Sequence, residues 1–516
     1  MVKCAYRGDR IREIEEKWID ENVSDEKEKE MKKMNLNFIL KSLGEKANCR
    51  FDAIPGKEFC IFHDPNCWRE RPDEVRREFL KHLKEDEERF FVGFHLPSVR
   101  FPEVVEKDVH MELAKFHDEL TAFETVFKGL ASFDGATFRR ALFYRADFLG
   151  VASFDGSVFS GRVIFRDSTL LPDLLDNCLD LSSYISFRNI NFENSGKVVF
   201  DGCLMRRVSF IYTDLGRIEF RNVGWDRDFK VFDEKLFLIK IGKGRKDFIR
   251  ECEEKLERIL DVLDGRKRDD EIEREIDLEP SINEVRTILN ELKKKGKLSE
   301  EDEKKREELE NKLRELKKEL RERIGKRIDD LKKEEEWNKI FEEVEKDGGL
   351  TFENVLAVYR GLRDNYDYYL KYEESGRFFI NEMMLRRIIG KWYGGEKHSG
   401  LEGVKRKLSG FTEKFVMWVY EILALYGESY TRPILWAILV IITSSLTRPL
   451  WLWMRNPNYV PELSFIFKEV RTSILVFFQL YWDTRTLTIV ERLLSIPILG
   501  TLILALRRKL ERRVRH

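Results

Sequence analysis

A phenylalanine recurs every five residues in the stretch ASFDGATFRRALFYRADFLG, residues 131–150. A small alanine stands two positions before each phenylalanine. Five steps along an α-helix rotate the side chain by about 140° and scatter it around the axis, and five steps along a flat strand move it to the opposite face. Neither element can bury this repeat on one side, so the chain must coil with five residues per step. The repeated pairs are Ala131 and Phe133, Ala136 and Phe138, Ala141 and Phe143, and Ala146 and Phe148.

The same repeat continues to about residue 225 with two small insertions and one interruption at 169–184. Each five-residue step fits one short side of a coil with four sides, whose bulky residue and small partner point inward. Four steps close a turn of about 20 residues, and stacked turns hydrogen-bond about 4.8 Å apart as a parallel β-helix. We expect the interruption to form a loop or a distorted coil. The later bulky positions are Phe154, Phe159, Phe165, Phe187, Phe192, Phe200, Met205, Phe210, Leu215, Phe220 and Trp225.

Residues 115–225 resemble the pentapeptide-repeat family, whose signature is a small residue two positions before a central Phe or Leu. The resemblance implies a right-handed quadrilateral parallel β-helix. Cys203 occupies one of the small inward positions, and we expect its thiol to pack as an apolar group. Some members of the family mimic DNA with an acidic surface, but FRRALFYR and LMRRVSF place arginines on the outward positions. We therefore expect no DNA mimicry.

The length of 516 residues predicts several domains. We expect a small Cys/His domain with helices at 1–90, the β-helix at 91–230, a charged helical and coiled-coil insertion at 231–346, an amphipathic helical hairpin at 347–425, and a two-span membrane module with an intermediate apolar helix at 426–516.

Charged residues make up 37% of the chain, against roughly 25% in ordinary domains. This richness suits surface ion-pair networks and a thermophilic source. The net charge of −1 gives no argument for a nucleic-acid partner.

Three cysteines and a histidine near the N-terminus have the pattern of a zinc site. Cys60 and His63 are separated by two residues, a spacing that lets both ligands hold one face of a tetrahedral ion. Cys49 precedes them across a Pro-Gly turn, and Cys4 or Cys67 completes a Cys3His set. We favour structural zinc, because so small and polar a segment cannot bury an adequate core. Reduced, partly buried thiols and redox chemistry are the alternatives, and catalytic zinc is not expected.

The charged middle of the chain has helical periodicity. A helix is expected at 246–264, a second near Ser281, and a third from Ser299 through Leu331. The third has a narrow apolar seam with steps of three and four. Its partner is either the preceding helix, in an intramolecular hairpin that we favour, or a neighbouring subunit.

Two amphipathic helices follow the Gly348 and Gly349 break. Their apolar positions indicate a hairpin, with the turn at Ser375 and Gly376. Its tyrosines and methionines are expected to form a core rather than a ligand site.

The C-terminal part contains the longest apolar stretches. The uncharged run 433–447, extendable to Met454, and the segment 487–506 are expected to span a membrane. The apolar segment between them, 462–483, is too short and charged for a third span. Basic segments on both outer ends place the N-terminal domains in the cytoplasm of a multi-pass cell-membrane protein. The first twenty residues contain no apolar core, so no secretory leader is expected.

This region looks like the two-span pore domain of prokaryotic cation channels, on the segments YRGLRDNY, YGE and ERLLSIPILG. The resemblance implies pore positions at Gln479, Tyr481, Asp483 and Glu491. Where such channels carry a Gly-Tyr-Gly filter, this chain has FQLYWD, whose lack of glycine argues against a potassium filter. An ionisable residue inside a span is a functional candidate. The alternative for Glu491 is an interfacial ion pair with Arg492.

We expect an oligomeric ion-channel-like protein, with a tetramer favoured, since a two-span unit cannot enclose a pore alone. A membrane-anchored scaffold, holding a protein partner on the β-helix or the charged helices, is the alternative. An enzyme is not expected, because no phosphate loop, catalytic triad or paired-acid motif stands out. The sequence also gives no ground to claim a cluster of His82, His95, His110 and His117, because they lie in dissimilar segments.

Overall fold

The computed structural model divides the chain into two compact units, Met1–Asn365 and Tyr366–His516. All described strands lie in the first unit. The described residues are 2–23, 26–170, 181, 184–226, 228–264, 266, 285, 288–289, 300–344, 349–389, 415–455, 462–481 and 486–514.

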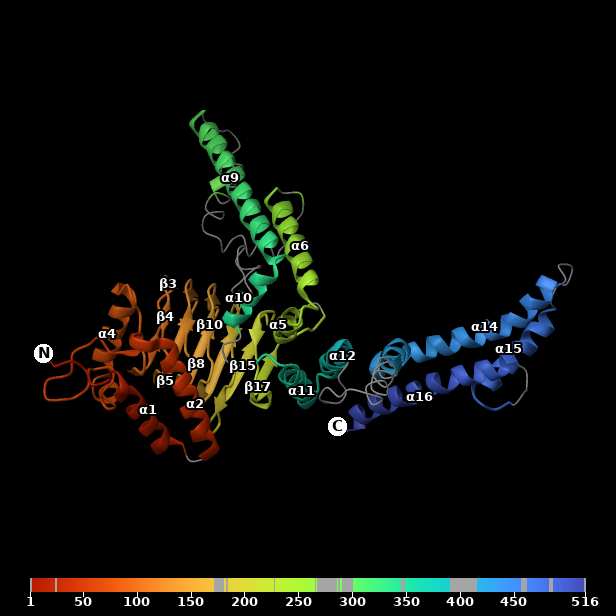
Figure 1. Cartoon of the computed structure of the whole chain (residues 1–516), viewed down its shortest axis with the longest axis horizontal. Helices are drawn as coiled ribbons and strands as arrows, with labels where there is room; N and C mark the ends of the chain where they lie inside the picture. Colours follow the sequence, from red (N-terminus) through yellow and green to blue (C-terminus); the bar gives the residue numbers. More distant parts are fainter. Residues whose placement is uncertain are drawn as a thin grey trace. The chain divides into compact units, whose positions relative to one another are not determined.

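A parallel β-solenoid of about five turns forms the centre of the first unit (Figure 1). Three parallel sheets run along it, ordered β1-β5-β8-β12-β15-β17, β16-β13-β10-β7-β4 and β3-β6-β9. The strands are β1 (His95–Leu96), β2 (Val99–Arg100), β3 (Val104–Val105), β4 (Val109–His110), β5 (Lys115–Phe123), β6 (Val126–Phe127), β7 (Ala131–Ser132), β8 (Thr137–Tyr144), β9 (Asp147–Phe148), β10 (Ala152–Ser153), β11 (Val158–Phe159), β12 (Arg162–Arg166), β13 (Ile185–Ser186), β14 (Asn191–Phe192), β15 (Lys197–Asp201), β16 (Val208–Ser209) and β17 (Ile218–Arg221).

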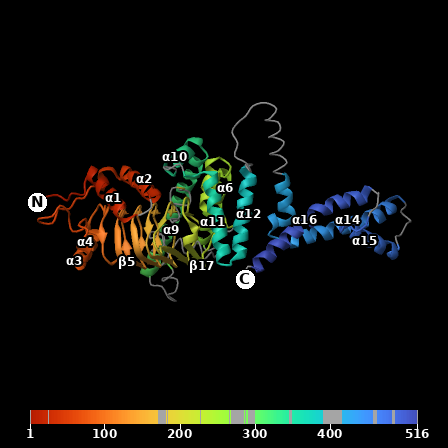
Figure 2. The ribbon, with the colours of Figure 1, turned by 90° about the horizontal axis from the view of Figure 1, so that it is seen from below.

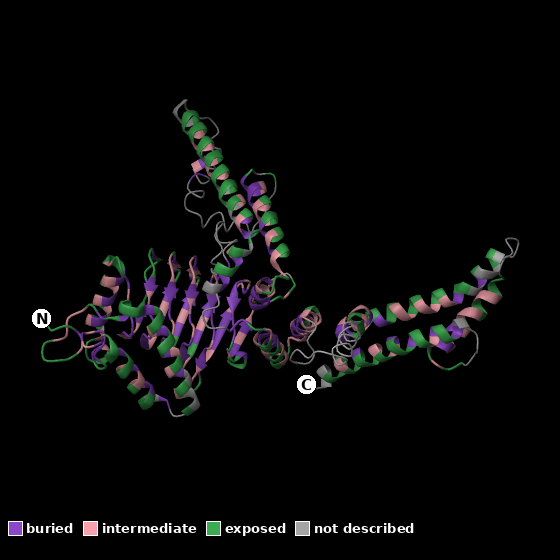
Figure 3. Ribbon diagram, viewed as in Figure 1, coloured by how far each residue is buried: buried purple, intermediate pink, exposed green. Residues whose placement is uncertain are grey.

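The repeated phenylalanines stack inside the solenoid as the repeat predicts. Phe143 pairs in register with Phe165, which pairs with Phe200 on the next turn. The ring of Phe143 lies parallel to that of Phe165, with centroids 4.5 Å apart. Figure 3 shows the strands as a buried column. Phe192 differs from the other repeat phenylalanines, because it is only half-buried. Most of the interruption at 169–184 lies outside the described residues.

The outward charges pair between neighbouring turns. Arg145 contacts Glu124 at 2.9 Å, and Lys197 contacts Glu219 at 2.5 Å. Each pair joins residues about one turn apart in the sequence. The charged surface therefore links the turns, although each exposed pair is worth only about 0.2–1 kcal/mol.

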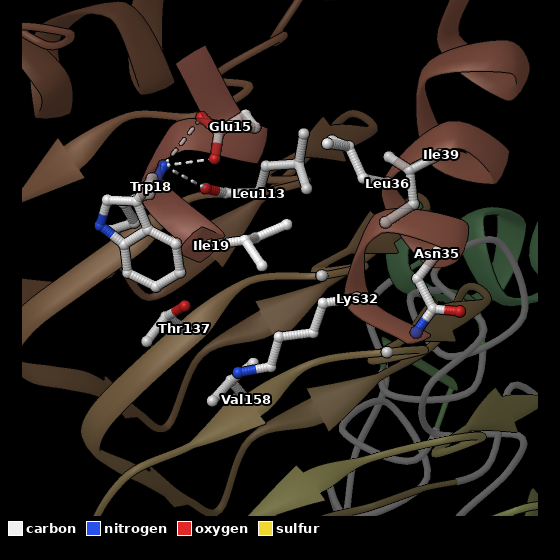
Figure 4. Close-up of a pocket in the computed structure, with 13 residues that line it drawn as sticks. Glu15, Trp18, Ile19, Lys32, Asn35, Leu36, Ile39, Leu113, Thr137 and Val158 are labelled. Carbon is white, nitrogen blue, oxygen red and sulfur yellow. Dashed lines mark hydrogen bonds and ion pairs between the residues drawn. The ribbon is translucent and has the colours of Figure 1, made fainter. Parts of the chain in front are cut away.

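The N-terminal helices lie along one flank of the solenoid (Figure 2). Glu15 of α1 forms a buried ion pair with Lys115 of β5 at 2.9 Å, and Lys32 of α2 contacts Glu193 at 2.6 Å. Figure 4 shows Glu15, Leu36 and Ile39 extending from these helices toward the strands around a cavity of about 40 Å³. The elements of this region are α1 (Asp9–Asn22), α2 (Glu26–Leu43), η1 (Gly44–Ala47), α3 (Cys67–Glu70) and α4 (Pro72–Glu85).

Helices α5 and α11 cover the last turn of the solenoid. The Asp233 carboxylate accepts hydrogen bonds from the Ser209 hydroxyl at 2.5 Å and the Phe210 amide at 3.1 Å. The Asn365 side-chain amide donates to the carbonyls of Leu215 and Ile218. This covering blunts an otherwise open sheet edge. The remaining elements of the first unit are η3 (Leu215–Arg217), α5 (Phe232–Lys240), α6 (Arg245–Leu263), α9 (Glu300–Leu331), α10 (Glu334–Val344) and most of α11 (Phe352–Tyr368).

The charged helices α6 and α9 contact each other. Lys317 of α9 bridges to Asp264, just after α6, at 2.6 Å. The helix expected near Ser281 falls largely on residues outside the described ranges.

The turn predicted at Ser375 and Gly376 is wrong. Both residues are buried within α12, and the chain turns earlier, where Leu370 has a positive φ of 63°. A Cβ on Gly376 would lie 2.6 Å from an oxygen of Glu428. The small residue is therefore needed for close packing rather than for a turn.

The second unit is helical. Its helices are α12 (Tyr372–Ile389), a helix over Phe415–Gly427 that ends in η4 (Leu425–Gly427), α14 (Thr431–Arg455), α15 (Leu463–Phe477) and α16 (Thr486–Val514). Leu423, Phe477 and Ile498 form its buried centre. Many apolar side chains remain exposed, among them Leu435 at 65% and Ile503 at 64%.

Among the described helices, only Thr488–Glu511 is long and apolar enough to cross a membrane. Thr431–Thr447, in the first expected span, is a shorter apolar helix.

Candidate metal centre

The four predicted ligands lie together where three backbone segments cross. The segment with Cys4 runs beside residues 49–59, since the amide of Cys4 donates to Phe51 O and that of Cys49 donates to Tyr6 O. A tight hairpin, turned at Gly56 with φ 82°, then brings the chain back to Cys60. His63 follows in the next turn, before α3. Distant parts of the sequence therefore supply one compact set of ligands.

The distances between the ligand atoms match a tetrahedral zinc ion. All four ligand atoms lie within 4.8 Å of one another, and all four residues are buried. Cys49 Sγ lies 3.7 Å from Cys60 Sγ, and His63 Nδ1 lies 3.7 Å from Cys4 Sγ and 3.2 Å from Cys60 Sγ. A tetrahedron with Zn–S of about 2.3 Å and Zn–N of about 2.0 Å has edges of about 3.8 Å for S···S and about 3.5 Å for S···N. The fourth member of the cluster is thus Cys4 rather than Cys67, which lies outside it.

The surrounding residues orient the ligands. His63 Nε2 lies 2.9 Å from Val92 O, so a proton on Nε2 leaves the Nδ1 lone pair facing the cysteines. The Cys60 amide donates to Cys4 Sγ at 3.3 Å. The Tyr6 ring stacks on the His63 imidazole with centroids 4.0 Å apart, and its hydroxyl donates to Glu15 at 2.9 Å. The centre is thereby linked to the ion pair that joins α1 to the solenoid.

The contacts among the three thiols shift their pKa values in opposite directions. Hydrogen bonds from the thiols of Cys49 and then Cys60 lower the pKa of Cys4. The hydrogen bond with Cys4 raises the pKa of Cys49 to about 12, and the pKa of Cys60 is raised mainly by the same partner. The hydrogen bonds with Cys4 therefore oppose ionisation of Cys49 and Cys60 unless a positive charge compensates, and a bound metal would supply that charge.

The expected pore residues lie in the second unit. Gln479 has a φ of 63°, and its amide donates to Ser495 Oγ at 2.6 Å while its carbonyl accepts from Arg492 Nε at 2.6 Å. The buried Glu491 carboxylate accepts a hydrogen bond from the Ser473 hydroxyl of α15. Sequence reasoning missed Ser473 and Ser495. Their position as polar residues within apolar stretches is the signal that could have found them.

The other two pore positions are less informative. Tyr481 is 42% exposed. Asp483 lies outside the described residues.

Sequence reasoning missed one contact between two of the histidines. His95 Nδ1 and His117 Nε2 lie 2.9 Å apart, and the Trp68 ring stacks on His117 with centroids 4.0 Å apart. The two histidines are one solenoid turn apart, because β1 pairs with β5. Burial lowers the pKa of His95. The pKa of His117 is lowered to about 4, mainly by burial and to a lesser extent by the positive charges of Lys115 and Arg69.

Comparison with protein families bears on the solenoid. No curated protein matches the chain. Residues 122–169 match the family model described as Pentapeptide repeats (9 copies). This stretch covers β6 to β12, where the phenylalanine rings stack. The solenoid of this protein is therefore built from pentapeptide repeats.

Proposed function

We propose that this protein is an oligomeric, ion-channel-like membrane protein whose cytoplasmic β-solenoid acts as a regulatory or scaffolding domain. The observation that carries the proposal is Glu491, an ionisable side chain buried against α15 near the start of the apolar stretch of α16. In a membrane, a buried ionisable group is costly and usually marks an ion or proton pathway.

The arrangement of the helices supports this proposal. α15 contacts both α14 and α16, and these two also contact each other. The segment after α15 is held to α16 by Gln479, Arg492 and Ser495. One such unit cannot enclose a pore, so the exposed apolar faces meet lipid and neighbouring copies, most simply in a ring of four. Without glycine at 478–483, conduction is poorly selective for potassium.

Zinc at Cys4, Cys49, Cys60 and His63 has a structural role in this proposal. Three thiolates and an imidazole close the coordination shell, so no position remains for a substrate. The ion staples the N-terminal segments on which α1 and the solenoid rest.

A non-conducting, membrane-tethered scaffold is the second candidate function. The side chain of Gln479 is bonded to α16 of its own chain, which favours a sealed module. In that case the solenoid flank and the charged helices hold a protein partner.

Cation flux distinguishes the two functions. Purified full-length protein in liposomes is expected to pass monovalent cations, and Glu491→Gln is expected to lower the flux by about tenfold or more, the effect of about 1.4 kcal/mol on a barrier. Glu511→Gln is the matched control, since it removes an exposed carboxylate near the end of the same helix. A monomer in mild detergent that gives no flux would reject the channel and leave the scaffold.

A further inference from the structure

A second cavity lies in the helical unit, at the point where the apolar part of α16 ends. Its volume is about 430 Å³, within the roughly 300–1,000 Å³ of small-molecule sites. α12, residues 427–428 and the last turns of α16 form its walls. Because Thr488–Glu511 is the described helix suited to cross a membrane, this cavity is at the level of the lipid headgroups if α16 spans the bilayer.

The charged side chains that line the cavity carry one positive charge in excess. Arg377, Arg508 and Lys509 oppose Glu373 and Glu428. Arg377 contacts Glu373 at 2.8 Å, and Arg508 contacts Glu428 at 3.0 Å. The excess fits a ligand with a single negative charge.

Arg508 forms the fixed part of the site. It also donates to Tyr426 O at 3.1 Å, and its guanidinium lies 4.0 Å from the centre of the Phe379 ring. The Lys509 ammonium lies over the Tyr430 ring at 4.2 Å. Arg508 is therefore anchored by several groups. Lys509 and Arg377 line the same cavity with long, positively charged side chains.

We propose that this cavity binds the phosphodiester headgroup of an anionic phospholipid, with Lys509 and Arg377 donating to its phosphate oxygens. The inference rests on the proposed function in requiring α16 to cross a membrane. A phosphodiester carries one negative charge, which matches the excess, whereas a phosphate monoester carries about 1.5 to 2. Ala505 and Ile380 supply an apolar part of the wall beside the acyl region. Basic cavities between helices at the cytoplasmic surface suit such headgroups.

The test uses the full chain in mild detergent, titrated with fluorescent phosphatidylglycerol and with phosphatidylcholine. Lys509→Gln and Arg377→Gln are each expected to weaken phosphatidylglycerol binding by about tenfold, as the loss of a charge-assisted hydrogen bond predicts. Arg507→Gln is the matched control, because Arg507 precedes the site on the same helix and pairs with Glu511 at 2.8 Å. It is expected to leave the affinity unchanged. Arg508 is left intact because its contacts hold the fold.

Four outcomes would overturn the inference. Arg507→Gln weakening binding as much as Lys509→Gln would show a diffuse effect of charge. Equal binding of phosphatidylcholine would show that the net charge of the lipid plays no role. Displacement by glycerophosphoglycerol, the soluble phosphodiester headgroup of the same lipid, at equal concentration would indicate a soluble ligand. Binding in detergent does not require conduction, so absent flux leaves the inference standing. Failure of the chain to associate with vesicles of either lipid would reject the membrane proposal and the inference together.

Discussion

Replacing Phe143 by alanine tests the stacked core of the solenoid. The side chain is completely buried, and its ring contacts those of Phe165, Phe154 and Phe148. Backbone hydrogen bonds to the turns on both sides hold the surrounding backbone in place, so the hole cannot collapse. Removing the buried ring and leaving a cavity in its place lowers the free energy of unfolding by about 3–5 kcal/mol for Phe→Ala. We expect a value near the upper end, since stacked rings contribute beyond their area.

Phe123→Ala is the matched control. Phe123 is 38% exposed and stacks on Tyr144 at 5.0 Å, so its loss is expected to cost about 1 kcal/mol. Hydrogen exchange measured by mass spectrometry on peptides of the solenoid reports the local free energy of opening, which avoids assuming two-state unfolding of a chain with two units. If Phe143→Ala changes this free energy no more than Phe123→Ala does, the inward stacking is refuted.

Two further predictions concern ionisable groups in the first unit. The pKa of His117 is lowered to about 4, below about 6.5 in an unfolded chain. Above about pH 6.5 the imidazole is neutral in both states and costs no stability. As the pH falls toward 4, the unfolded chain binds a proton that folded His117 does not, so the free energy of unfolding falls by on the order of 3 kcal/mol. Chemical denaturation across this range measures the loss, and a His117→Gln variant that keeps the same slope would contradict the assignment. Glu15→Leu is expected to destabilise by about 3–5 kcal/mol because it leaves the Lys115 ammonium buried and unpaired. Adding Lys115→Met should restore most of that loss in thermal unfolding, and an equally unstable double variant would show that the ion pair is not the cause.

The solenoid was predictable because its signal is local. A five-residue period in side-chain size, seen at Phe138 and Phe143, excludes helices and flat strands without knowledge of distant contacts.

The histidine pair was predictable only in part. Once the turn length is known, the 22-residue separation of His95 and His117 places them on adjacent turns, but their segments share no sequence pattern.

The metal centre was predictable in its ligand types and not in its complete membership. The spacing of Cys60 and His63 indicates a metal by itself, whereas the choice of Cys4 over Cys67 depends on backbone crossings more than 40 residues apart. Tyr6 carries no sequence signal for its contact with His63. Gly376 was misread as a turn because glycine serves close packing as well as turns, and only the position of Glu428 decides between them.

The zinc content of the purified full-length protein tests the metal centre most directly. Mass spectrometry of the metal should find about one zinc per chain, as a closed Cys3His shell requires. Cys60→Ser should lose the metal, and Cys67→Ser, which changes a buried cysteine outside the cluster, should retain it. A wild-type chain without stoichiometric zinc, or equal loss in both variants, would contradict the assignment of Cys4, Cys49, Cys60 and His63 as a metal site.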